Sequence, residues 1–247
     1  MMLSRTVEAE ALDSLASDDP AAMQSRRDLR LIHRAMGTRG ILRRALEDMM
    51  SCRHDRSPLH VLELGAGDGS LMLAVARALA PRFPPVNLTL LDAQSLVGRE
   101  TLQSYAGVGW TAHTSVCDVF NWAHTDPGLL RKRGTQARWD IIVVNLFLHH
   151  FEGLELATLL HAIASRSDRF IACEPRRGWL PLVASRLVGA LGANAVTRAD
   201  AVLSVKAGFN GRELSALWPH NGAAWRTAES SAGLFTHCFR ADRLGVK

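Results

Sequence analysis

The sequence has few cysteines, no long apolar run and only a small excess of positive charge. Its four cysteines, Cys52, Cys117, Cys173 and Cys238, form no Cys-x-x-Cys pair. Their spacing fits neither a zinc site nor a disulfide framework, so we expect buried thiols in a reducing compartment. No apolar stretch reaches membrane-spanning length, and the N-terminal stretch has early acids and no apolar core, which is unlike a secretion signal. We therefore expect a cytoplasmic protein without a membrane span.

The charge pattern does not favour a nucleic-acid partner. The chain has 29 Lys and Arg against 24 Asp and Glu, a formal net charge of +5. A nucleic-acid-binding domain usually carries a basic stripe with interleaved aromatic residues. The nearest feature is Arg131, Lys132 and Arg133 before Gly134, which we interpret as a solvated loop. No nucleic acid is expected as a partner.

The N-terminal part has its own pattern. Residues 1 to about 25 are rich in Ala, Asp and Ser and predict a loosely attached leader or a short helix. Between Asp28 and Met50 apolar residues recur mostly at three- or four-residue steps, which is typical of helices. Gly37 and Gly40 interrupt this pattern, so two helices joined by MGTRG are predicted.

After Pro58 short apolar segments alternate with amphipathic ones. The expected strands are His60–Leu64, Val86–Leu91, Gly109–Val116, Trp139–Leu146 and Phe170–Cys173. The expected helices are Ser70–Ala80, Ser95–Tyr105, Leu154–Ser165 and Leu180–Leu191. A hairpin is predicted from Ala224–Glu229 and Leu234–Arg240, joined by Ser230–Gly233. Near-continuous apolar strands separated by helices predict an α/β fold, with a mostly parallel sheet and helices on both faces.

These patterns divide the chain into two parts. Residues 1–57 form an N-terminal leader and helical cap segment, and residues 58–247 form the main domain, with a helical lid insertion around 176–215. The apolar residues of that insertion predict either a helix packed on the sheet or a lid over an apolar ligand. Trp179 and Phe209 are candidates for stacking on such a ligand.

The segment VLELGAGDGS, residues 61–70, is the most informative. Gly65, Gly67 and Gly69 follow the end of a strand at every second position, and a helix comes next. Glycine allows a positive φ and lets a ligand lie against bare backbone, while the helix N-terminus offers N–H groups to an anion. A dinucleotide fingerprint requires a third glycine where Ser70 stands. Asp92, at the end of the next strand, can accept hydrogen bonds from both ribose hydroxyls, or it can cap the following helix.

The pattern E-x-G-x-G-x-G, matched from Glu63 to Gly69, resembles motif I of the class I S-adenosylmethionine-dependent methyltransferases. In layout the resemblance covers roughly residues 28 to 240. It implies S-adenosylmethionine as the cofactor and a Rossmann-like seven-stranded sheet of order 3-2-1-4-5-7-6 with an antiparallel last strand. It also implies that Asp118 accepts a bond from the adenine amino group, with a structural role as the alternative. The expected cofactor-binding residues are Glu63, Gly65, Ala66, Gly67, Gly69, Asp92, Ala93, Asp118, Val119 and Asn145.

The fourth strand leads into NLFLHHF, which contains Asn145, His149 and His150. Ligands of open α/β sheets bind beyond the carboxyl ends of the strands, which places these residues beside the glycine loop. The segment is similar to motif IV of small-molecule methyltransferases. In plant phenolic O-methyltransferases a histidine at this step removes the hydroxyl proton, and by position this is His149.

The same family has an acid after the fifth strand that orients the base, and FIACEP places Glu174 there, with a structural role as the alternative. This chain departs from the plant pattern because His150 stands where those enzymes have an acid. It also lacks their large N-terminal dimerisation domain. The expected catalytic residues are therefore His149, His150 and Glu174, and which histidine is the base stays open.

From DLRLIHRAMG to AVLSVKAGFN the chain also resembles bacterial methyltransferases found with polyketide pathways. This resemblance implies methyl transfer to a hydroxyl of a phenolic or polyketide-like aromatic small molecule, which is the expected partner; a homodimer is left open. The alternatives are a C-methyltransferase acting on a quinone or polyketide ring, an NAD-dependent oxidoreductase, and a non-catalytic module that kept the fold. The acids around His149 form no metal-ligand set with plausible spacing, so no metal is expected.

Overall fold

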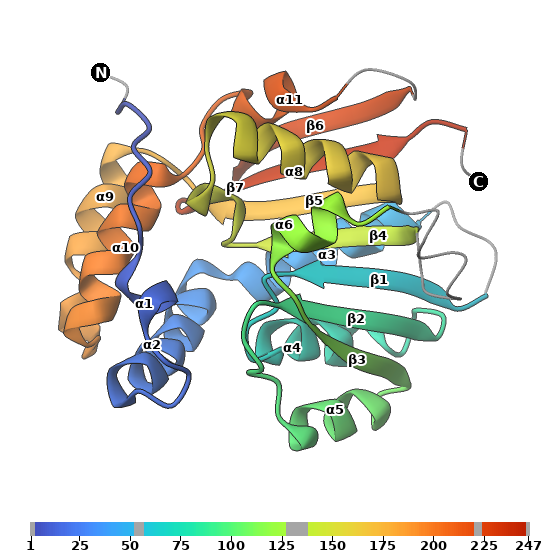
Figure 1. Cartoon of the computed structure of the whole chain (residues 1–247), viewed down its shortest axis with the longest axis horizontal. Coiled ribbons are helices and arrows are strands. Elements are labelled where there is room, and N and C mark those ends of the chain that lie inside the picture. The colour runs from blue at the N-terminus through green and yellow to red at the C-terminus, as the bar shows by residue number, and fades with distance from the viewer. Residues whose placement is uncertain (1–2, 52–56, 127–137, 220–223, 246–247) are drawn as a thin grey trace.

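The computed structural model describes residues 3–51, 57–126, 138–219 and 224–245 (Figure 1). Cys52 and the run from Arg131 to Arg133 lie outside these ranges. Within them, no helix is long and apolar enough to cross a membrane.

Seven strands form one sheet in the order β3-β2-β1-β4-β5-β7-β6. Their bounds are β1 Leu59–Leu64, β2 Val86–Asp92, β3 Trp110–Val116, β4 Trp139–Asn145, β5 Ser167–Pro175, β6 Trp225–Ala232 and β7 Thr236–Arg243. Strands β1 to β5 pair in parallel, whereas β7 pairs antiparallel with both β5 and β6. This confirms the predicted α/β class, the strand order and the antiparallel last strand.

The helices form three groups (Figure 1). One group packs on one face of the sheet: α3 Thr38–Met50, α4 Ser70–Leu79 and α5 Arg99–Ala106. A second packs on the other face: α6 Val119–His124, α8 Gly153–Arg166 and α11 Glu213–Leu217. The third contains α1 Ala11–Ser14, α2 Pro20–Met36, α9 Trp179–Arg186 and α10 Ala195–Ala207, with the short 3-10 helix η2 Val188–Leu191. Helix α10 packs against α1, α2 and α9, and against the 3-10 helix η1 Leu148–His150 that follows β4. The third group therefore lies at the carboxyl end of β4.

The central strands are buried on both faces. In β4, Ile142 and Val144 belong to the core under α6 and α8, while Ile141 and Val143 belong to the core under α3 and α4. Successive side chains of a strand point to opposite faces, so a strand covered on both sides needs apolar residues at every position. This is why WDIIVVN shows no alternation between apolar and polar residues.

Several element boundaries differ from those expected. Helix α2 begins at Pro20 because Asp19 caps it, accepting a 2.7 Å bond from the Ala21 amide. Only Gly37, with φ +68°, separates α2 from α3, so Gly40 lies inside a helix. Helix α5 begins at Arg99 rather than Ser95, and the helix expected over Leu180–Leu191 ends at Arg186 and gives way to η2. The C-terminal hairpin turns later than expected, after Ala232.

Of the two forms expected for the first 25 residues, the structure shows the short helix, α1, in a segment that is fastened to the rest of the chain. We call residues 3–19 the N-terminal strap. Arg177 donates a 2.8 Å bond to the Leu3 carbonyl, and the Thr6 amide donates a 3.2 Å bond to the Lys206 carbonyl. Asp200 accepts bonds of 2.9 and 3.0 Å from the amides of Ala11 and Leu12. These partners lie far along the chain, so the composition of the strap could not show that it is fastened.

The described cysteines match the expectation only in part. Cys173 is buried, whereas Cys117 and Cys238 are half-buried. Cys173 and Cys238 face each other across β5 and β7 with their sulfur atoms 3.3 Å apart. These two thiols are brought together by the antiparallel pairing of β5 and β7. Their spacing in the sequence does not indicate it.

Candidate active site

A cavity of 410 Å³ lies at the carboxyl ends of β1, β2 and β4. All but one of the expected cofactor-binding residues line it, namely Glu63, Gly65, Ala66, Gly67, Asp92, Ala93, Asp118, Val119 and Asn145. Gly69 does not; it stands behind the loop at the start of α4. His149 and His150 line the cavity, and Glu174 lies behind His149. The fold therefore brings the two sets of expected residues to one place.

The glycine loop exposes bare backbone to the cavity. Gly65, Gly67 and Gly69 have φ values of +68°, +56° and +70°, a region that residues with a Cβ rarely adopt. A Cβ built on Gly67 would meet nothing within 4 Å, so the loop leaves open space there. A Cβ on Gly65 would lie 2.6 Å from the ring of Phe147, so this glycine permits the close approach of the segment after β4.

Asp92 and Asp118 both bind backbone amides. Asp92 accepts a 2.8 Å bond from Gly67 and a 2.9 Å bond from Gln94, which ties the end of β2 to the glycine loop. Asp118 is the N-cap of α6 and accepts bonds of 2.8 and 3.1 Å from Phe120 and Asn121. A structural role for Asp118, the alternative expected from the sequence, is thus observed, and its contact with an adenine amino group stays a prediction.

Glu63 and Asn145 present buried acceptors to the cavity. Glu63 Oε2 and Asn145 Oδ1 have no hydrogen-bond partner among the described residues, although both side chains are at least nine-tenths buried. Burial raises the pKa of Glu63 to about 8, with the charges of Asp68 and Asp92 adding to the effect. An unpaired buried acceptor costs roughly 1–3 kcal/mol, so both atoms suit a ligand that donates hydrogen bonds.

The segment after β4 is held in place by Glu174. Its Oε1 accepts bonds of 3.1 and 2.9 Å from the amides of Phe147 and Leu148, and its Oε2 accepts one of 3.3 Å from the His149 amide. Glu174 is fully buried at the end of β5. Just before these amides, Leu146 adopts φ +48°, the one positive φ among the described non-glycine residues. Such backbone strain persists only where surrounding contacts impose it, and it clusters at functional sites.

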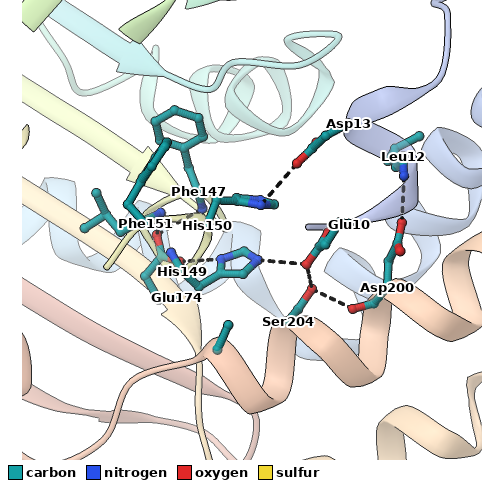
Figure 2. Close-up of polar contacts among 12 residues, drawn as sticks. Glu10, Leu12, Asp13, Phe147, His149, His150, Phe151, Glu174, Asp200 and Ser204 are labelled. Atoms are coloured by element: carbon teal, nitrogen blue, oxygen red, sulfur yellow. Dashed lines mark hydrogen bonds and ion pairs between the residues drawn. The ribbon is translucent and has the colours of Figure 1, made fainter. Parts of the chain in front are cut away.

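His149 is bound on both ring nitrogens (Figure 2). Nδ1 lies 2.8 Å from Glu174 Oε2, and Nε2 lies 3.3 Å from Oε1 of Glu10 in the N-terminal strap. Burial lowers the pKa of His149, but the hydrogen bonds and negative charges of Glu10 and Glu174 outweigh it and raise the pKa to about 9. The ring is therefore an imidazolium at neutral pH while both carboxylates are in place.

His150 has a different environment. Its Nδ1 lies 3.2 Å from Asp13 Oδ2, and its ring centroid lies 4.2 Å from that of His149. Burial lowers the pKa of His150, and the positive charge of His149 lowers it further. Because the two rings lie so close together, the pair favours one charged ring, and this ring is His149.

The segments Arg30–Arg39 and Trp179–Phe209, expected from the sequence to build the acceptor pocket, contribute Arg30, His33 and Ser204 to the cavity lining. The sequence patterns missed Glu10 and Asp13, which also line the cavity. Glu10 contacts a residue 139 positions away, and no local spacing signals such a contact. The two stacking candidates were wrong. Trp179 is 57% exposed and Phe209 is 1% exposed within the core, and neither lines the cavity. From the helical segment 176–215, the cavity is lined by Ser204.

Glu10, His149 and His150 also bring nitrogen and oxygen atoms within 4.8 Å of one another, a spacing at which a metal ion can bind. The strap supplies Glu10, which the spacing around His149 could not reveal. In this arrangement each of these side chains pairs with an oppositely charged or hydrogen-bonding group, and the absence of a metal stays our prediction.

Solved methyltransferase structures share this fold. The plantazolicin methyltransferase BpumL in complex with a triazolic desmethylPZN analog and SAH has a TM-score of 0.60 at 12% identity, covering 91% of this chain and 92% of that one. Magnesium protoporphyrin IX methyltransferase (ChlM) from Synechocystis PCC 6803 with bound SAM has a TM-score of 0.50 at 16% identity, covering 94% and 87%. Mitomycin 7-O-methyltransferase MmcR has a TM-score of 0.52 at 21% identity, covering 94% and 60%. No protein-family model and no curated protein matches the sequence.

Proposed function

We propose that the chain is an S-adenosylmethionine-dependent methyltransferase that methylates a hydroxyl group of an aromatic small molecule. One observation carries this proposal: the bare backbone of the glycine loop and the buried His149–Glu174 pair meet at one cavity. Its volume of 410 Å³ lies within the range of small-molecule sites. The fold shared with structures that contain SAM or SAH supports the choice of cofactor.

The residues around the cavity fit this cofactor. When bound, S-adenosylmethionine supplies an activated methyl group on a sulfonium sulfur. Glu63 and Asn145 would accept hydrogen bonds from its amino group, which would satisfy their unpaired oxygen atoms. The space beside Gly67 would admit the ligand against the backbone. Asp92 would bind the ribose hydroxyls through its remaining lone pairs, and Asp118 would bind the adenine amino group.

His149 would act as the general base. A phenol titrates near pH 10, so it is largely protonated at neutral pH, and a positioned base contributes roughly 10²–10⁴-fold to the rate. Nε2 of His149 would accept the hydroxyl proton, while Glu174 on Nδ1 fixes the ring and stabilises the resulting cation. The ring of His150 lies next to that of His149 and would line the acceptor side.

The proposal extends to the helices around the cavity. The helical cap within residues 1–57 and the lid insertion around 176–215 would enclose the acceptor, since α1 and α2 both pack against α10. Ser204 of α10 lines the cavity next to Glu10.

The first test measures ligand binding and turnover. Isothermal titration calorimetry with S-adenosylhomocysteine and with NAD separates a methyltransferase from a nucleotide-dependent oxidoreductase. We expect binding of the first and none of the second; the opposite result would overturn the proposal. Methyl-labelled S-adenosylmethionine with a panel of phenols and quinones then shows whether oxygen or carbon is methylated.

The second test concerns the base. In His149→Ala we expect turnover to fall by about 10²–10⁴-fold, with affinity for S-adenosylhomocysteine unchanged, because the ring would act on the acceptor and not on the cofactor. Turnover near that of the wild-type enzyme would show that His149 is not the base.

A further inference from the structure

The nitrogen of His149 that would receive the acceptor proton already has a partner. Glu174 occupies Nδ1 at 2.8 Å, so Nε2 is the nitrogen left for an acceptor. Glu10 Oε1 lies 3.3 Å from that Nε2. An acceptor hydroxyl and the Glu10 carboxylate cannot both occupy the one hydrogen-bonding position of this nitrogen. Acceptor binding at His149 therefore requires Glu10 to move.

Glu10 is held in this position from several sides (Figure 2). Ser204 of α10 donates a hydrogen bond to the same Oε1. Asp200, one turn earlier on α10, accepts hydrogen bonds from the backbone amides of Ala11 and Leu12, the two residues that follow Glu10. Arg5 donates bonds of 3.3 and 2.8 Å to the carbonyls of His149 and Phe151, so the strap is tied to the segment that carries the histidines. These contacts build Glu10 into the site from a distant part of the chain.

The contact with Glu10 is the weaker of the two that His149 makes. Its 3.3 Å separation is longer than the normal range for a hydrogen bond between charged groups, whereas the 2.8 Å contact with Glu174 lies within it. Glu174 is fully buried and accepts three backbone amides as well, while Glu10 belongs to a strap with exposed residues on either side of it. Replacing the hydrogen-bond partner of Nε2 therefore disturbs much less of the structure than replacing the partner of Nδ1.

The charges facing His149 come from the strap and from β5. Glu10 and Asp13 belong to the strap and α1, and Glu174 belongs to β5; Arg5 lies at the backbone of η1. The positive ring of His149 in turn helps to lower the pKa of Glu10, against the effect of burial, which raises it. With a pKa of about 9 for His149, only about one molecule in a hundred has a neutral ring at pH 7. His149 is a poor proton acceptor while Glu10 remains beside it.

We propose that Glu10 is a positioning residue that holds Nε2 of His149 in the acceptor-free enzyme and yields this place to the acceptor hydroxyl. This inference rests on the proposed function. As Glu10 withdraws, the Glu10 carboxylate takes the proton from Nε2 and then releases it to water. The lone pair left on Nε2 then accepts the hydrogen bond, and finally the proton, of the acceptor hydroxyl. The strap thus keeps the base protonated until an acceptor is present.

The test begins on the enzyme without acceptor. NMR titration of the histidine-labelled full chain gives the pKa of His149 in the wild type, in Glu10→Gln and in Glu8→Gln. Glu8 is exposed on the same strap, so it is the matched control. We expect the pKa of His149 to fall by about one unit or more, a tenfold change in proton binding, in Glu10→Gln alone. An unchanged pKa in Glu10→Gln would overturn the inference.

The second readout is the pH profile of kcat/KM with a phenol that the wild-type enzyme methylates. In Glu10→Gln we expect the acidic limb to move to lower pH, so that kcat/KM at pH 7 rises several-fold. A purely structural role for Glu10 would lower kcat/KM at every pH, which would contradict the inference. Asp200→Asn, which weakens the anchoring of the strap, should move the limb in the same direction and serves if Glu10→Gln folds poorly.

The two proposals fail separately. If no phenol is methylated but the pKa of His149 falls in Glu10→Gln, the proposed function fails and the contact between Glu10 and His149 stands. If phenols are methylated and neither the pKa nor the pH profile moves, only the role of Glu10 is wrong.

Discussion

Glu174 binds His149 through both its backbone and its ring. Oε2 accepts the His149 amide at 3.3 Å and lies 2.8 Å from Nδ1 of the same residue. One buried carboxylate at the end of β5 thus sets the path of the chain after β4 and the orientation of the imidazole. The structural and the functional interpretation of Glu174 are therefore compatible.

This double role predicts two losses in Glu174→Gln. A glutamine offers one acceptor oxygen where the carboxylate offers two, so at least one buried donor loses its partner, at a cost of about 1–3 kcal/mol in the free energy of unfolding. Turnover should fall at least tenfold because the ring is no longer fixed. Urea denaturation and steady-state kinetics measure the two effects.

Glu229 provides the matched control for this substitution. It accepts the amides of Leu214 and Ser215 and pairs with His237 at 2.8 Å, but it does not line the cavity. Glu229→Gln should lose similar stability and keep its turnover. Equal losses of turnover in both variants would show that Glu174 acts only through stability.

Gly67→Ala should separate backbone strain from ligand binding. A methyl group at φ +56° is strained by about 1–2 kcal/mol and would enter the space proposed for the cofactor. Gly211 has φ +61° and open space around it, yet lies outside the cavity. We expect both alanine variants to lose similar stability, and only Gly67→Ala to lose affinity for S-adenosylhomocysteine in calorimetry. Equal affinities would place the cofactor elsewhere.

Binding of S-adenosylhomocysteine should release a proton from Glu63 at neutral pH. The pKa of this residue is about 8 without ligand, so it is largely protonated at pH 7, and a ligand ammonium would favour the ionised form. Calorimetry in buffers of different ionisation enthalpy counts the protons released. The same number of protons in Glu63→Gln and in the wild type would contradict this assignment.

The raised pKa of Glu63 also has a consequence for stability. A carboxyl whose pKa is higher in the folded than in the unfolded chain binds its proton more tightly in the folded state. The contribution of Glu63 to the free energy of unfolding is therefore most favourable at pH values below 4.5, the pKa in the unfolded chain, and declines until the pH reaches about 8. Glu63→Gln removes this dependence, so the ligand-free variant should gain stability relative to the wild type as the pH rises from 5 to about 8. Thermal unfolding across that range measures it.

Methyl transfer should not depend on a metal ion. Although Glu10, His149 and His150 lie close enough for one, the proposed proton transfer needs Nε2 of His149 to be free for the acceptor. Dialysis against EDTA should leave kcat unchanged, and added zinc should inhibit by binding that nitrogen. Loss of activity on dialysis and its recovery with a divalent ion would instead make these residues metal ligands.

Much of the fold is predictable because it depends on local patterns. A strand buried on both faces must be apolar at nearly every position, and runs such as WDIIVVN reveal it. The positive φ values at Gly65 and Gly67 need residues without a Cβ, so the loop is recognisable as a candidate ligand-binding turn before any packing is known. His149 and His150 follow a strand whose carboxyl end faces that loop in any sheet of this order.

Boundaries and distant contacts were not predictable in this way. The start of α2 depends on Asp19 as the helix cap. The strap contains several other polar residues that could cap a helix, so the sequence does not single out Asp19. The pairing of Glu10 with His149 depends on α10, whose Asp200 and Ser204 hold the strap against the site.

The sequence alone therefore determines the strands, the glycine loop and the histidines beside it, since each follows from residue types at fixed local spacing. Only the tertiary structure decides the raised pKa of His149, because Glu10, which lies 139 positions away in the sequence, is brought next to the ring by the fold.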